Sequence, residues 1–242
     1  QTSNYLFLGR FCNGQGWAYS ELYDFKKAYS FNKLSLENVN TLRKSPAIIY
    51  WALEMQAMAE VNLMENKFEM GQVDEAWEHL TRFEEVSAHP DYAWTRDRWL
   101  TRMNDLKGTI LLDREDIDSA EELARQCLDA AAKRGWKKYV GKAERLLGRT
   151  FTTRGAFDQA EEHMQTALAK LEEVGNPKQR WITHMALARL YKKMNRPDLE
   201  REQWQAARAV IQATADGLED QDLRQIFINA APVQEIMEHA AR

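Results

Sequence analysis

An internal repeat of 40 residues is the feature of this sequence that most constrains its fold. Gly108, Gly148 and Ala188 occupy equivalent small-residue positions, and 148 − 108 and 188 − 148 both give 40. The same step carries Gly135 onto Gly175, so the turns repeat together with the segments between them. A period of this size over three units is typical of repeat proteins, in which each unit packs only against its neighbours.

Each repeat is predicted to form two helices joined by a tight turn. In the middle repeat, apolar residues recur at three- and four-residue steps over 143–171, and Thr153-Arg154-Gly155 interrupts them. That spacing is typical of an amphipathic helix, a turn and a second helix. The small residues Gly148 and Ala160 are expected to let the two helix backbones approach closely.

Here the sequence resembles the tetratricopeptide repeat family. Three segments match the family pattern, through Gly16, Trp17, Tyr19, Glu21, Leu22, Asp24, Phe25, Ala28 and Asn32; Leu147, Gly148, Phe151, Gly155, Phe157, Ala160 and Ala167; and Leu187, Ala188, Tyr191, Pro197 and Ala207. The period departs from the usual length of about 34 residues. Glu144 and His184 stand where the family has its first aromatic residue.

The resemblance implies an all-α fold, a right-handed α-solenoid of about five helix hairpins with a C-terminal capping helix. The whole chain is then one domain, with repeats at 4–45, 46–88, 91–134, 137–174 and 177–215, followed by capping helices over 216–242. Pro46 and Asp91 are interpreted as the starts of the second and third repeats. Asn176-Pro177 is predicted to cap the fifth.

The repeats and the tail together resemble the C-terminal region of large bacterial signalling ATPases, of the adenylate cyclase or transcription-regulator type. This further resemblance depends on Trp181 and on the tail residues Leu223, Arg224, Phe227 and Val233. It implies a regulatory or sensor module that binds proteins. The sequence has no Gly-x-x-x-x-Gly-Lys-Ser/Thr phosphate loop, and it begins without Met, so we expect a fragment of a longer protein.

Composition narrows the classes of function. The net charge of −4 gives no reason to expect nucleic acid as a partner. The longest apolar run, 47–53, is too short to span a membrane, and a cytoplasmic location is therefore expected. Cys12 and Cys127 lie far apart and are predicted to be buried, reduced thiols.

No enzymatic motif is found, so we expect no catalytic residue, no cofactor and no metal. The glycines of Gly14-Gln15-Gly16 lie within a predicted helix, which does not fit a nucleotide loop. Glu161-Glu162-His163 could hold a metal ion only with help from another helix, and a solvated helix face is the simpler interpretation.

One group of charged residues points to a binding surface. In such solenoids the first helix of each hairpin lines a concave groove, and alignment of the repeats places six cations there: Arg102, Lys142, Arg145, Arg149, Arg189 and Lys192. Their excess over Asp105 predicts an acidic peptide or carboxylate-bearing ligand. The alternative is that they are ordinary surface cations, paired with carboxylates such as Glu144.

Three other functions stay open on the sequence alone. A small peptide or metabolite could bind in the groove and control an attached effector domain. An enzyme site could be built across repeats, although no residue pattern points to one. A homodimer could form at the N-terminal edge, where Leu6, Leu8 and Phe11 have no preceding repeat to cover them.

The tryptophans are expected mainly in the core. Trp77, Trp181 and Trp204 fall at positions that pack between helices. Trp94 and Trp99 lie near a loop, and they could instead line the groove between the second and third repeats.

Overall fold

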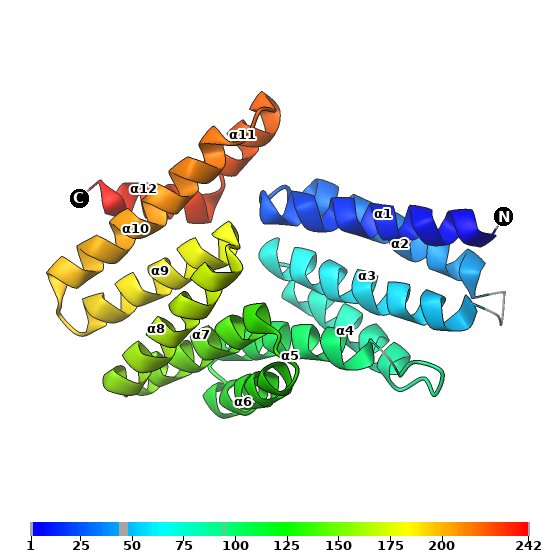
Figure 1. Cartoon of the computed structure of the whole chain (residues 1–242), viewed down its shortest axis with the longest axis horizontal. Coiled ribbons are helices and arrows are strands. Elements are labelled where there is room, and N and C mark those ends of the chain that lie inside the picture. Colours follow the sequence, from blue (N-terminus) through cyan, green and yellow to red (C-terminus); the bar gives the residue numbers. More distant parts are fainter. Residues whose placement is uncertain (1, 44–47, 94, 242) are drawn as a thin grey trace. The chain divides into compact units, whose positions relative to one another are not determined.

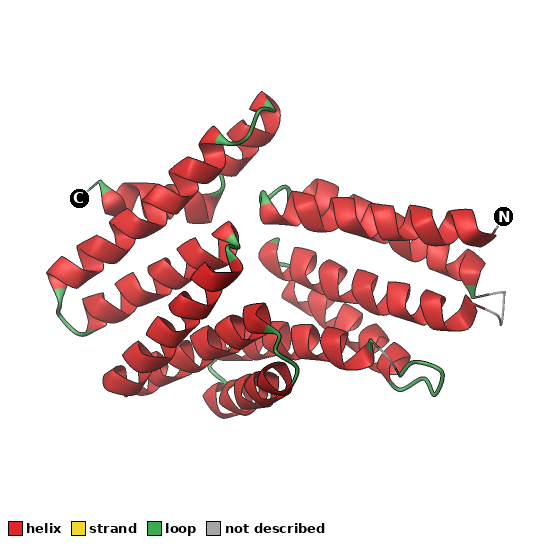
Figure 2. Cartoon of the chain, in the orientation of Figure 1, coloured by secondary structure: helices red, strands yellow, loops and turns green. Residues whose placement is uncertain are grey.

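The computed structural model of the chain describes residues 2–43, 48–93 and 95–241. Over these ranges the protein is all-helical, with twelve α-helices and no strand, and consecutive helices pack as hairpins (Figures 1 and 2). The predicted all-α solenoid with a C-terminal cap is confirmed. The chain forms two compact units, Gln1–Met103 and Asn104–Arg242. The expectation of one continuous domain stays a prediction.

The N-terminal unit contains two hairpins and the beginning of a third. Asp24 caps the second helix, since its Oδ1 accepts a hydrogen bond of 3.1 Å from the backbone N–H of Lys27. The helices of this unit are α1 (Thr2–Glu21), α2 (Phe25–Leu42), α3 (Ile49–Glu69) and α4 (Val73–Ser87), and α5 (Arg96–Asp113) begins in it.

The C-terminal unit holds the more regular repeats. Asn176 caps α9 as predicted: its Oδ1 accepts from the Gln179 N–H at 2.9 Å, and Pro177 occupies the first helical position. After the end of α5, the helices are α6 (Ile117–Lys133), α7 (Lys137–Arg154), α8 (Phe157–Val174), α9 (Pro177–Lys193), α10 (Pro197–Asp216), α11 (Gln221–Ile228) and α12 (Ala231–Ala240).

The turn inside each hairpin has one residue in the left-handed conformation. Gly71 and Gly155 occupy this position with φ of 75° and 77°. At the equivalent position in the other hairpins stand Tyr23, Glu115 and Asn195, with φ of 64°, 66° and 55°. Glycine adopts this region without strain, whereas residues with a Cβ are disfavoured there. Five hairpins therefore share one turn geometry, although only two have the residue that suits it best.

The small residues of the repeat allow close helix packing, as predicted. A Cβ built on Gly148 would lie 2.5 Å from Cγ of Met164 and 3.1 Å from the carbonyl oxygen of Ala160. One built on Gly108 would lie 2.8 Å from Cδ2 of Leu146. Gly148 fixes the approach of the two helices of one hairpin, and Gly108 that of the first helices α5 and α7, so the 40-residue step is a consequence of packing.

The first helix of the third repeat begins later in the chain than predicted. The third repeat was expected to begin at Asp91, but this is wrong by five residues, since α5 begins at Arg96. The backbone N–H of Tyr92 donates to the His89 carbonyl at 2.9 Å, and Tyr92 is fully buried, so packing holds 89–92 in a turn. Pro46 and Trp94 lie outside the described residues.

Two of the three tryptophans expected in the core, and both cysteines, are buried. Trp181 and Trp204 are 1% and 3% exposed, whereas Trp77 is only half-buried. Trp99 is also buried, so it does not line an open groove. Both cysteines are free thiols in the core.

Candidate interaction surface

The six predicted groove cations all lie on first helices of hairpins, but in two units. Arg102 is on the part of α5 that belongs to the N-terminal unit. The other five are on α7 and α9 of the C-terminal unit: Lys142, Arg145, Arg149, Arg189 and Lys192. Hydrogen bonds from Arg145 to α9, described below, show that α7 and α9 lie side by side. The structure thus brings five of the six cations onto neighbouring helices.

Two of these cations pair with acidic residues of α5. Lys142 Nζ lies 2.5 Å from a carboxylate oxygen of Asp105, and the two side chains are 14% and 7% exposed. Arg149 donates to Asp113 at 2.7 Å, where the side chains are 35% and 45% exposed. The first pair is therefore largely shielded from solvent, whereas a ligand could reach the second.

Arg102 forms an equivalent link within the N-terminal unit. Its guanidinium donates to the Glu65 carboxylate on α3 at 2.7 Å, and the two side chains are 13% and 23% exposed. Because both groups are mostly covered, this pair connects neighbouring first helices and offers little surface to a ligand.

Arg145 joins α7 to α9 through neutral acceptors. It donates to the Gln179 carbonyl at 3.2 Å, to the Gln179 side-chain oxygen at 2.7 Å and to the Thr183 hydroxyl at 3.1 Å. Three directed hydrogen bonds hold a guanidinium firmly. Arg145 therefore has a structural role in positioning the two helices.

The last two cations are the most accessible. Arg189 donates to Glu235 of α12 at 2.6 Å, with side chains 53% and 36% exposed. Lys192 is exposed near the end of α9, and no ion pair joins it to the described part of the chain. Four of the six cations are thus paired with carboxylates, and their role in binding stays a prediction.

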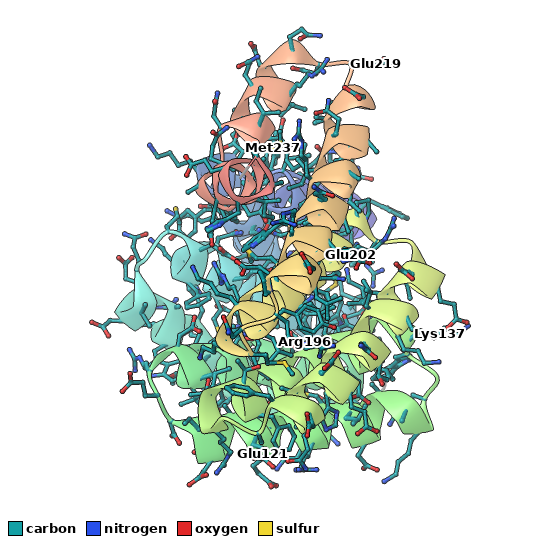
Figure 3. The ribbon with its side chains drawn as sticks, turned by 90° about the vertical axis from the view of Figure 1, so that its left-hand side faces the viewer. Glu121, Lys137, Arg196, Glu202, Glu219 and Met237 are labelled. Carbon is teal, nitrogen blue, oxygen red and sulfur yellow. The ribbon has the colours of Figure 1, made fainter. Side chains whose placement is uncertain are left out.

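A second set of charged contacts links two hairpin turns of the C-terminal unit to the second helix of the preceding hairpin. Arg154 lies 3.1 Å from Glu121, and Arg196 lies 2.9 Å from Glu161, the glutamate 40 residues after Glu121. Figure 3 labels Glu121, on α6, and Arg196, in the turn before α10. Exposed pairs of this kind stabilise little individually, so we interpret them as setting the register between repeats.

A polar pair that is buried or half-buried recurs inside the hairpins and was missed from the sequence. Nδ1 of His79 lies 2.7 Å from Glu60, and Nδ1 of His163 lies 2.6 Å from Glu144. One repeat later the residue types are exchanged: His184 occupies the position of Glu144 and Gln203 that of His163, and Nδ1 of His184 lies 2.8 Å from the side-chain oxygen of Gln203. In each case the partner lies 19 residues away, and this constant separation was the signal that could have revealed the pairs.

Burial affects the ionisation of one member of this set. The pKa of His184 is lowered from its ordinary value, chiefly because burial disfavours the charged ring, although the hydrogen bond to Gln203 opposes the effect. The ring of His163 stacks on Phe151, with centroids 5.2 Å apart. These contacts give the histidines packing roles.

Four asparagines form a second buried network, in the N-terminal unit. Asn62 donates to Asn13 at 3.0 Å and to Asn32 at 3.1 Å, and Asn32 donates to Asn66 at 2.9 Å. Gly16 makes room for this network, because a Cβ on it would collide with the Asn32 side chain. The glycine that resembled part of a nucleotide loop therefore serves packing.

The described residues contain no group of three or more His, Cys, Asp or Glu side chains placed to hold a metal ion. None of the helices in the described ranges is both long and apolar enough to cross a bilayer.

The consecutive helix hairpins place the protein in the class of α-solenoids. Neither family models nor curated proteins match the sequence. Among solved structures, the chain is similar to BtubC (BKLC) from P. vanneervenii, with a TM-score of 0.58 and 18% identity. The match covers 90% of this chain and 86% of that one. At this identity the likeness shows the fold alone.

Proposed function

We propose that the protein is a non-catalytic interaction scaffold that binds a protein or peptide partner through the first helices of its C-terminal hairpins. The observation that carries the proposal is the row of accessible cations on α7 and α9: Arg149, Arg189 and Lys192. The proposal includes three further expectations from the sequence: a relationship to tetratricopeptide repeat proteins, a cytoplasmic location, and a regulatory role in a bacterial signalling protein.

The solvent exposure of the six cations narrows the predicted site. Lys142 and Arg102 are mostly covered by their carboxylate partners, and Arg145 is held by three hydrogen bonds. Arg149 and Arg189 are equivalent positions 40 residues apart, and their pairs are open to solvent. Exposed ion pairs contribute about 0–1 kcal/mol. The carboxylates of an acidic peptide could therefore replace Asp113 and Glu235 at small cost.

An acidic peptide is favoured over a small metabolite by the layout of these groups. They are carried by two neighbouring helices and are not gathered around one buried polar centre. Extended ligands match such repeated positions, since each hairpin offers one contact and the contacts add along the chain. Because the net charge of the chain is −4, the attraction for an acidic peptide must come from the local cluster of Arg149, Arg189 and Lys192.

The proposal is tested with a fluorescein-labelled peptide of alternating Glu and Gly residues in an anisotropy titration. Replacement of Arg149, Arg189 and Lys192 by Ser should weaken binding by about tenfold or more, since three charge-assisted contacts are lost. A matched control removes three exposed cations from second helices, Arg125, Lys133 and Lys170, and should weaken binding by less than about twofold. Equal losses in both variants, or no binding by the wild-type chain, would contradict the proposed site.

A further inference from the structure

One face of the first helix is apolar and uncovered. Its residues, Phe7, Phe11, Gly14 and Ala18, follow at steps of four, three and four, which places them on one side of α1. Phe7 and Phe11 are 71% and 63% exposed, and Gly14 and Ala18 are exposed as well. We call these four residues the α1 face. Leu8 beside it is also exposed, but Leu6 packs against the core of α2 and α3, contrary to the prediction that it lies open.

The α1 face corresponds to the stacking surface of every later first helix. Tyr23 and Gly71 occupy the same turn position, and 71 − 23 gives 48, so the equivalents of Phe7, Phe11, Gly14 and Ala18 in α3 are Met55, Ala59, Asn62 and Asn66. All four are buried. Met55 packs in a cluster with residues of α2, and Asn62 bonds to both helices of the preceding hairpin. On α1 the same four positions are exposed.

The size pattern of the α1 face differs from that of the internal stacking surfaces. At the position of Phe11 the later helices have Ala59, Met103, Ala143 and Thr183, each fully buried. At the position of Gly14 they have the larger Asn62, Leu106 and Leu146, and only α9 has a small residue, Ala186. A preceding hairpin docked as the others are would meet a bulky phenylalanine where three of four helices provide a small side chain.

A second copy of the chain fits this pattern. The N-terminal half of the α1 face is bulky and the C-terminal half is small. When two such helices pair antiparallel with residue numbers that sum to 25, Phe11 faces Gly14 and Phe7 faces Ala18 of the other copy. A Cβ built on Gly14 meets no atom of its own chain within 4 Å, so space for the partner's ring exists there. A twofold axis satisfies both contacts twice.

The charges around the α1 face do not oppose this pairing. Arg10 is the charged residue closest to its centre, and its guanidinium is paired with Glu54 and lies over the ring of Trp51 at 4.9 Å. Glu21 stands at the end of the helix, away from the phenylalanines. Two identical helices can thus approach without like charges in contact. In Figure 1, α1 and α2 form the outermost pair of the N-terminal unit, so other helices of that unit leave α1 accessible.

We propose that the α1 face is a self-association surface and that it forms an antiparallel, twofold-symmetric helix pair in a homodimer. This inference is independent of the proposed peptide site, which lies on α7 and α9 of the other unit. Failure of one therefore leaves the other standing.

The first test is sedimentation equilibrium over about 1–200 µM, a range suited to an interface of one helix pair. Wild-type chain should pass from monomer to dimer within it. Gly14→Trp fills the space that the partner's Phe11 needs, and because a Cβ on Gly14 meets no neighbouring atom within 4 Å, the monomer should fold unchanged by circular dichroism. Its dimer dissociation constant should rise at least about tenfold. Val174→Trp, at a site 39% exposed on α8, is the matched control and should dimerise normally.

A cross-linking experiment tests the direction and register. Phe7→Cys and Ala18→Cys variants are mixed and oxidised, while Cys12 and Cys127 contribute little because both are buried. Antiparallel pairing should give mainly disulfides between the two different variants. Disulfides mainly within each variant would contradict the register, and a wild-type chain that stays monomeric to 200 µM, or a Gly14→Trp chain that dimerises as wild type, would overturn the proposal.

Discussion

The stacking surfaces of the first and the last hairpin differ in whether other helices of the chain cover them. At the C-terminal end, α11 and α12 fold back on the last hairpin: Phe227 lies against Trp181 with ring centroids 5.4 Å apart, and His239 stacks on Trp204 at 4.5 Å. At the N-terminal end, the α1 face leaves Phe7 and Phe11 mostly in solvent. A helix-hairpin stack must cover the apolar surface of each terminal repeat. Here the chain itself covers one of these surfaces, and we propose that a second copy covers the α1 face.

The largest expected effect separates a covered phenylalanine from an uncovered one. Phe227→Ala removes a fully buried ring and should lower the free energy of unfolding by about 3–4 kcal/mol. Phe11→Ala, at a site 63% exposed, should change the stability of the monomer by less than about 0.5 kcal/mol. Urea denaturation at low protein concentration, where the monomer dominates, measures both. Equal losses of unfolding free energy in the two variants would show that Phe11 is as well covered in the monomer as Phe227.

Breaking the buried Lys142–Asp105 ion pair between α7 and α5 should lower the free energy of unfolding nearly as much as Phe227→Ala. Lys142→Met leaves Asp105, 7% exposed, without its cation, and should destabilise the C-terminal unit by about 3 kcal/mol. The double change Lys142→Met with Asp105→Leu should restore most of the loss, because no unpaired charge remains. Lys133→Met, whose side chain is 72% exposed, is the control and should cost less than about 0.5 kcal/mol. Thermal unfolding of the four chains decides this.

A smaller effect is expected at equivalent turns. Glu115 has φ of 66° at the position where Gly155 has φ of 77°. Glu115→Gly should raise the free energy of unfolding by up to about 1 kcal/mol, since glycine adopts this region without strain. Gly155→Ala should lower it by about 1 kcal/mol. If both changes have the same sign, the strain assigned to the turn is absent.

The smallest effect is a pH dependence within the last full hairpin. Because burial lowers the pKa of His184, the unfolded chain binds more protons than the folded one near and below the ordinary value of about 6.5. The stability contribution of the neutral ring is present above that pH and is lost as the pH falls through the folded pKa. His184→Gln should therefore flatten the decline in melting temperature between about pH 7 and 5. An unchanged slope would show that other groups cause it.

The parts of the fold that depend on contacts within one repeat can be predicted from the sequence. Gly148 and Gly155 each set a local geometry, so their spacing predicts the hairpins closely. The start of α5 was missed because the burial of Tyr92, a tertiary effect, holds 89–92 in a turn.

The candidate surface was harder to predict, because it depends on contacts between repeats. The alignment places Arg149 and Arg189 on first helices, but it cannot tell that Asp113 and Glu235 face them, as the offset between helices decides this. The α1 face shows the same limit: the sequence identifies an apolar edge, whereas the packing of Leu6 and the open space at Gly14 require coordinates.

Hydrogen–deuterium exchange at two protein concentrations tests the central claim most directly, because it reads both ends of the chain in one sample. At a concentration where dimer predominates, we expect slower exchange in α1 than at a concentration where monomer predominates, with α12 equally protected in both. Gly14→Trp should abolish the difference in α1. Protection of α1 that does not depend on concentration, or a change confined to α12, would contradict an account in which the C-terminal end is closed by its own helices and the N-terminal end by a second copy.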